Sequence, residues 1–280
     1  MVGLFLFFLV IALVVVFFYL TVWRDRRIRK RPLPREWLAI IQRAVPVYSS
    51  LSGAEQTRLQ QLISLFLARK KFYGCGGLAM TDEIRVTIAA QACLLLLHQG
   101  WSVYPDLFSI LVYPDAFRTR RDQHQEDGTV ISEHRELLGE SWSNGKVILS
   151  WDDVTRGVAD FADGRNVVLH EFAHQLDSAT GSTNGAPPLR TTSYAAWSRV
   201  LGENFDDLRL RSLRGEPTVL DSYGTTSPAE FFAVATEVFF ERPAALAAHR
   251  PELYQELSGY YRVDPRTWHG RAAPQEDASV

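Results

Sequence analysis

The chain has 280 residues, of which 46% are hydrophobic and 22% are charged, and its formal net charge is -2. This is the composition of a globular protein with enough apolar material for one sizeable core. The near-neutral charge argues against a direct nucleic-acid partner, and the two cysteines, Cys75 and Cys93, form neither a CxxC pair nor a disulfide framework.

Residues 1–22 form an uncharged apolar run, which as a helix would be about 33 Å long, the thickness of a bilayer's hydrocarbon core. Basic residues follow this run and none precedes it, which is the reverse of the order in a cleaved signal peptide. A basic cluster beside a membrane segment favours the cytoplasmic side. We therefore expect residues 1–23 to be an uncleaved transmembrane anchor in the cytoplasmic (inner) membrane, with the bulk of the chain in the cytoplasm. The alternative is an exported protein whose leader is removed. The basic cluster consists of Arg24, Arg26, Arg27, Arg29, Lys30 and Arg31.

A linker and a folded domain follow the anchor. The basic cluster and two prolines, Pro32 and Pro34, predict a linker over residues 24–35. The folded domain is expected over residues 36–265, and a disordered tail over residues 266–280.

The first part of the domain has a helical pattern. Its apolar residues recur at three- and four-residue spacing, which predicts helices over residues 36–48, 52–73 and 81–98. Ser52 and Glu55 form the capping signature of the second helix, and Thr81 or Asp82 caps the third. Three glycines in residues 73–80 interrupt the pattern between them.

The second part mixes strands and helices. Short β-branched and aromatic runs between turn residues predict strands over residues 107–114, 128–134 and 146–151. Helical patterns follow over residues 152–163, 166–177, 194–214 and 228–240. The long polar loop over residues 178–193 is either a lid or a plain surface excursion. The expected fold class is α+β and predominantly helical.

Residues 166–177 read NVVLHEFAHQLD and contain the pattern H-E-x-x-H. His170 and His174 share one face of a helix, so their ring nitrogens can be directed at one metal ion. Glu171 lies about 100° further round the helix, a position that suits a general base better than a ligand. The alternative is a buried helix whose histidines bond to backbone carbonyls. Because burial of these polar groups without partners is costly, the pattern favours a zinc site.

A third ligand has to come from elsewhere in the chain. The downstream segment SPAEFFAVATEVFFERP carries Glu230, Glu237 and Glu241, and the first two share a helix face. One such carboxylate would complete a His2Glu zinc site. Asp177 is the competing candidate, although its short side chain suits it better to hold a histidine ring. We favour Glu230, but spacing alone does not decide between the three.

HEFAHQLD, the later DSYGTTSPAEFFAVATEVFFERP and the upstream ESWSNGKVILSWDDV resemble the Mlc titration factor A family of zinc metallopeptidases. The resemblance covers residues 33–262. It implies that His170, His174 and Glu230 bind one zinc ion per chain, that Glu171 is the general base, and that Tyr223 assists the oxyanion. It also implies a gluzincin-like domain with a small β-sheet packed over the metal-binding helix, similar in its core to the catalytic domain of anthrax lethal factor.

We therefore expect a membrane-anchored zinc peptidase that acts on a peptide or protein substrate at the cytoplasmic face. The edge of the strand at 146–151 could hold an extended peptide by strand addition. The alternative is a regulatory protein that sequesters a transcriptional repressor or a membrane partner, because family members bind the repressor Mlc. Glu171 favours the enzyme, since a structural zinc site needs no base. The sequence does not distinguish an aminopeptidase from an endopeptidase.

Overall fold

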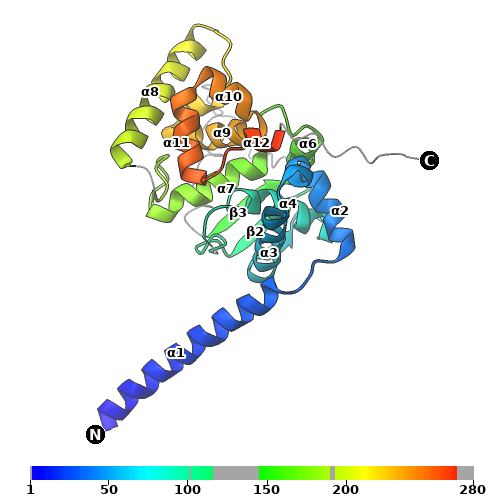
Figure 1. The fold of residues 1–280 in the computed structure, drawn as a ribbon, viewed down its shortest axis with the longest axis vertical. Helices are drawn as coiled ribbons and strands as arrows, with labels where there is room; N and C mark the ends of the chain where they lie inside the picture. The colour runs from blue at the N-terminus through cyan, green and yellow to red at the C-terminus, as the bar shows by residue number, and fades with distance from the viewer. Residues whose placement is uncertain (1, 101, 116–144, 190–192, 270–280) are drawn as a thin grey trace, which may run out of the picture.

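The computed structural model describes residues 2–100, 102–115, 145–189 and 193–269 of the chain (Figure 1). The strand predicted over residues 128–134 lies outside the described residues, as does the end of the predicted tail from residue 270 onward.

A long helix, α1 (Val2–Arg29), projects away from the remainder of the molecule (Figure 1). By length and composition its Leu6–Arg29 part could cross a membrane, and none of its most apolar stretch is buried. The helix continues through residues 24–29, which we expected in the linker, because arginine is a good helix former and no glycine or proline interrupts it before Pro32.

Three further helices and a 3-10 turn form the first part of the domain. They are α2 (Arg35–Ala44), η1 (Pro46–Ser50), α3 (Gly53–Arg69) and α4 (Asp82–Leu94). The capping box predicted for α3 is confirmed, since Glu55 N donates to Ser52 Oγ and Ser52 N donates to the Glu55 carboxylate. Thr81 rather than Asp82 caps α4, by accepting a hydrogen bond from the backbone N–H of Ile84.

The described sheet has three parallel strands in the order β1-β2-β3: β1 (Lys71–Gly74), β2 (Ser109–Tyr113) and β3 (Lys146–Ser150). The strands predicted at 107–114 and 146–151 are confirmed. The helix predicted to run to residue 73 is wrong at its end, because α3 stops at Arg69 and β1 follows. After Arg69 the chain pairs with the distant strand β2 and no longer continues the helix. The buried Lys70 ammonium supports this change by donating to the carbonyls of Tyr104 and Leu107, which precede β2.

Helices dominate the rest of the chain. They are α6 (Trp151–Ala159), α7 (Val167–Asp177), α8 (Tyr194–Leu213), α9 (Pro228–Glu241), α10 (Pro243–His249), α11 (Pro251–Tyr261) and α12 (Arg266–His269), with two 3-10 turns, η2 (Ser178–Thr180) and η3 (Ser222–Thr225). The tail was predicted from residue 266, but residues 266–269 form α12, in which the buried Trp268 ring stacks against the Phe240 ring. This mostly helical chain with a small sheet agrees with the predicted class.

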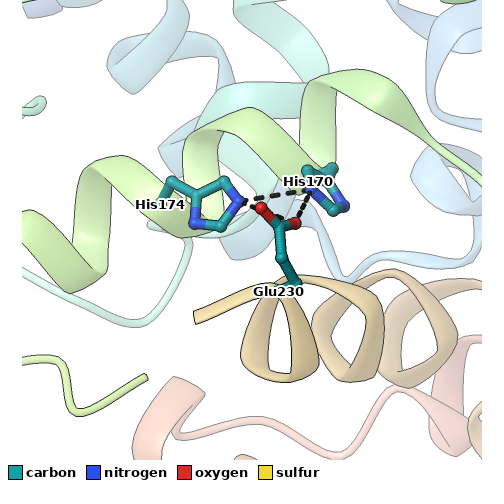
Figure 2. Close-up of side chains that lie close together, drawn as sticks. All are labelled: His170, His174 and Glu230. Atoms are coloured by element: carbon teal, nitrogen blue, oxygen red, sulfur yellow. Dashed lines mark hydrogen bonds and ion pairs between the residues drawn. The ribbon is translucent and has the colours of Figure 1, made fainter. Parts of the chain in front are cut away.

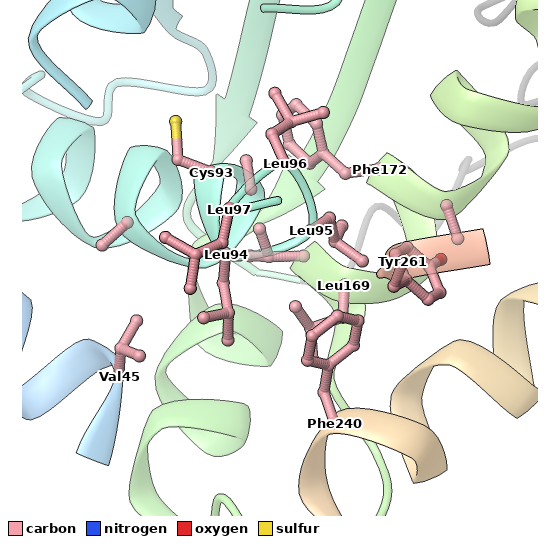
Figure 3. Close-up of a cluster of buried hydrophobic side chains, with 14 of the residues drawn as sticks. Val45, Cys93, Leu94, Leu95, Leu96, Leu97, Leu169, Phe172, Phe240 and Tyr261 are labelled. Atoms are coloured by element: carbon pink, nitrogen blue, oxygen red, sulfur yellow. The ribbon is translucent and has the colours of Figure 1, made fainter. Parts of the chain in front are cut away.

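Helix α7 runs through the core, where it packs against α4, α9, α6 and β3. The apolar cluster around it includes Leu94, Leu169 and Phe240 (Figure 3). On α7, Phe172 packs edge-on against Tyr104, with ring centroids 4.8 Å apart. Full burial of such a side chain contributes about 1.5–3 kcal/mol relative to an exposed one. The packing therefore holds α7 firmly while its two histidines face α9.

Candidate metal centre

His170, His174 and Glu230 bring one ligand atom each to a common point between α7 and α9 (Figure 2). The Nε2 atom of His170 lies 2.9 Å from Glu230 Oε2 and 3.2 Å from His174 Nε2. The third side of the triangle, from His174 Nε2 to Glu230 Oε2, measures 3.3 Å. Of the described residues, these are the ones grouped closely enough to hold a metal ion.

The triangle fits a tetrahedral zinc site. Zinc binds nitrogen and oxygen at about 2.0–2.1 Å, so neighbouring ligand atoms in a tetrahedron are about 3.3 Å apart. The three measured separations lie close to this value. Two neutral imidazoles and one carboxylate are also a common donor set for zinc, and they leave a fourth position for water or substrate.

The electrostatics of the three residues are those of a cation site. Burial raises the pKa of Glu230, but hydrogen bonds from His170 and His174 outweigh it and lower this pKa to about 2. Burial lowers the pKa of His170, but the carboxylates of Glu237, Glu230 and Glu171 raise it well above the usual value. The site thus concentrates negative charge around the two rings, which a bound cation would offset.

Glu237 contacts the opposite side of His170. Its Oε1 lies 2.7 Å from His170 Nδ1, whereas Glu230 faces Nε2 of the same ring. Carboxylates on the outer nitrogen of a ligand histidine fix its orientation and tautomer. The geometry therefore favours Glu230 as the third ligand and Glu237 as the group that orients His170.

Asn166 and Glu241 connect α7 to α9 behind His170 and Glu237. The Asn166 side chain accepts from the backbone N–H groups of Val168 and Leu169 and so caps α7. Its backbone N–H donates to Glu237 Oε2 at 2.5 Å, and its amide donates to Glu241 Oε1 at 3.0 Å. Burial, with the Glu237 charge, raises the pKa of Glu241 to about 8, although the bond from Asn166 opposes this. We did not single out Asn166 from the sequence, although an Asn directly before an apolar helical run is a cap signal.

Glu171 and Tyr223 lie beside the three candidate ligands. Glu171 is buried, with 6% of its surface exposed, and is close enough to His170 for its charge to raise the pKa of that ring. The Tyr223 ring packs against the His170 ring, with centroids 5.9 Å apart, and is 47% exposed. Asp221 holds the tyrosine by accepting from its backbone N–H, and Arg165 pairs with Asp221 across 2.7 Å. Through Asp221 and Arg165, Tyr223 is therefore connected to the segment that directly precedes α7.

Asp177, the competing ligand candidate, is not one of the three residues whose ligand atoms converge. Its Oδ2 accepts from the backbone N–H of Gly185 at 2.7 Å, inside the loop that we expected over residues 178–193. Gly185 has φ +79, and a Cβ there would lie 2.5 Å from the Pro228 carbonyl oxygen at the start of α9. Trp197 also donates to the Gly185 carbonyl. This part of the loop is packed against the start of the helix that carries Glu230.

Comparison with known proteins identifies related chains. The model of the family described as glucose-regulated metallo-peptidase M90 matches residues 20–262. An uncharacterized protein of Synechocystis sp. is 42% identical over 245 residues, which cover 87% of this chain and 89% of the relative. Proteins named Mlc titration factor A from Yersinia pestis and Yersinia pseudotuberculosis are 31% identical over 224 residues, which cover 79% of this chain and 82% of theirs.

Proposed function

We propose that this chain, which belongs to the Mlc titration factor A family of M90 metallopeptidases, is a zinc-dependent peptidase with a gluzincin-like active site. The observation that carries the proposal is the convergence of His170, His174 and Glu230 on one point, with separations that suit zinc. Glu171 on the same helix adds the base that hydrolysis requires.

The proposed chemistry divides between the metal and the protein. Zinc held by the three ligands would polarise the scissile carbonyl and acidify a water molecule. Glu171 would take the proton of the attacking water and deliver it to the leaving amine. Tyr223 would donate a hydrogen bond to the carbonyl oxygen as negative charge develops on it. Glu237 would keep His170 in the ligand orientation.

Metal removal tests the proposal directly. Purified full-length protein is expected to contain about one zinc ion per chain. A peptide library should be cleaved by this protein, should resist cleavage after chelation, and should be cleaved again when zinc is restored. Metal analysis that finds no zinc, even after reconstitution, would overturn the site assignment, and the cleaved bonds would distinguish an aminopeptidase from an endopeptidase.

We also propose that α1 anchors the protein in the cytoplasmic membrane with the metallopeptidase domain on the cytoplasmic side. The support is the apolar length of α1 and the arginines in its last turn, Arg26, Arg27 and Arg29. The intact chain is expected to stay in the membrane pellet after carbonate and high-salt washes. Release of the full-length chain by either wash would contradict the anchor, and a shortened N-terminus found by sequencing would indicate a removed leader instead.

A regulatory role is the second candidate, because relatives from Yersinia carry the name Mlc titration factor A. In this case the protein would sequester a transcriptional repressor or a membrane partner. A pull-down with the Glu171→Gln protein separates the two functions. A binding protein keeps its partner and its cellular effect without a general base, whereas a peptidase loses the effect.

A further inference from the structure

We propose that the domain makes a second contact with the bilayer, at the edge of the sheet where the three described strands begin. We call this surface the Phe108 edge and define it as Lys71, Phe108 and Lys146. Its partner would be the anionic headgroup layer of the leaflet from which α1 emerges. The inference rests on the membrane anchor proposed above and is independent of peptidase activity.

The junction between α1 and α3 sets the height of the domain above the bilayer. The uncharged run ends at Trp23, and Asp25 follows two residues later. Arg69 at the end of α3 donates through Nε to Asp25 Oδ1 at 3.3 Å and contacts the other carboxylate oxygen through a second nitrogen. Two helical residues rise about 3 Å, and the headgroup layer is about 5–7 Å thick. The end of α3 is therefore held at headgroup level.

The Phe108 edge lies next to this junction. Strand β1 begins at Lys71, two residues after Arg69, and the Lys71 backbone N–H donates to the Phe108 carbonyl at 3.1 Å. Lys71 is also in register with Ser109, which in turn is in register with Lys146. Parallel strands begin at one edge and are about 4.8 Å apart, so the whole edge lies within about 10 Å of the strand that follows α3.

The side chains of the edge suit a membrane surface. Phe108 is 67% exposed, and outside α1 it is the only phenylalanine among the exposed large hydrophobic residues of the described chain. Lys71 and Lys146 are exposed on either side of it. An aromatic ring between lysines partitions into the interfacial layer and attracts anionic lipids. Asp106 is exposed in the segment before Phe108 and is one negative charge against the two lysines.

The backbone holds Phe108 in its exposed position. Its N–H donates to the Gly145 carbonyl at 2.8 Å. Gly145 has φ +67, and a Cβ at this position would lie 2.5 Å from the Phe108 ring. A side chain at 145 would thus displace the ring, and glycine allows it to lie against the turn that starts β3. Together with α1, this fixed ring would give the domain two points of membrane contact and hence a defined orientation.

Fluorescence quenching in nanodiscs tests the inference with full-length protein. Cys75 is replaced by serine, buried Cys93 is kept, and Phe108→Cys carries an environment-sensitive label. Leu213→Cys carries the same label as the matched control, because it is 86% exposed at the end of α8. A lipid-borne quencher near the headgroups should quench the label at 108 in discs that contain phosphatidylglycerol, and should leave the label at 213 unquenched.

The charge contribution is measured in the same discs. Lys71→Glu combined with Lys146→Glu should reduce quenching at 108 by about twofold or more, as should replacement of phosphatidylglycerol by phosphatidylcholine. Equal quenching at 108 and 213, or no effect of either change, would overturn the inference. A failed anchor gives a different result, since the protein then does not enter the discs, and a failed peptidase assay leaves the quenching unchanged.

Discussion

Glu171→Gln is expected to lower the rate of peptide hydrolysis by about 10²–10⁴-fold, the usual contribution of a general acid–base group. Glutamine has nearly the shape of glutamate but cannot accept the proton of an attacking water. Glu171 is not among the three residues whose ligand atoms converge, so zinc content should remain at about one per chain. Turnover of a cleaved library peptide and metal analysis of the same preparation measure both quantities.

Glu203→Gln is the matched control for this variant, because it makes the same chemical change at an exposed site on α8. Its turnover and zinc content should equal those of the unmodified protein. Full activity in Glu171→Gln would remove Glu171 from the mechanism. Loss of zinc in that variant would mean that the residue holds the metal centre together and does not act as its base.

Glu230→Ala is expected to remove most zinc binding and, with it, the hydrolytic activity. Its carboxylate lies between the two histidines, so its loss removes one ligand and the negative charge that favours a cation there. Glu237→Gln should have a smaller effect and lower the zinc affinity by about 10–100-fold, because Glu237 orients a ligand histidine and does not bind the metal itself. Titration of each apoprotein with zinc against a competing chelator measures the difference.

The comparison also distinguishes the two carboxylates as ligand candidates. A larger loss of zinc affinity in Glu237→Gln than in Glu230→Ala would exchange their roles. Circular dichroism of both apoproteins provides the folding control, since Glu237 is buried and also accepts from the backbone of Asn166. An unfolded Glu237 variant can be replaced by Glu237→Asp, which keeps the charge but shortens the reach to His170.

Local features of the structure were predictable because they depend on neighbours in the chain. The helical repeat puts His170 and His174 on one face, and the Ser52 and Glu55 side chains cap their own helix. The apolar run of α1 and the strand at Lys146–Ser150 also follow from local pattern. The boundaries were less accurate, since Lys71–Gly74 pairs with β2 although residues 71–73 continue a helical pattern.

The sequence by itself determined the helix that carries H-E-x-x-H, the family, and an apolar segment long enough to cross a membrane. Only the tertiary structure decided that Glu230 lies against both histidines, that Glu237 contacts the other nitrogen of His170, and that Asp177 contacts Gly185. Glu230 and Glu237 share a face of α9, so helical periodicity treats them alike. The packing of α9 against α7, across sixty residues of chain, fixes which carboxylate reaches the space between the rings.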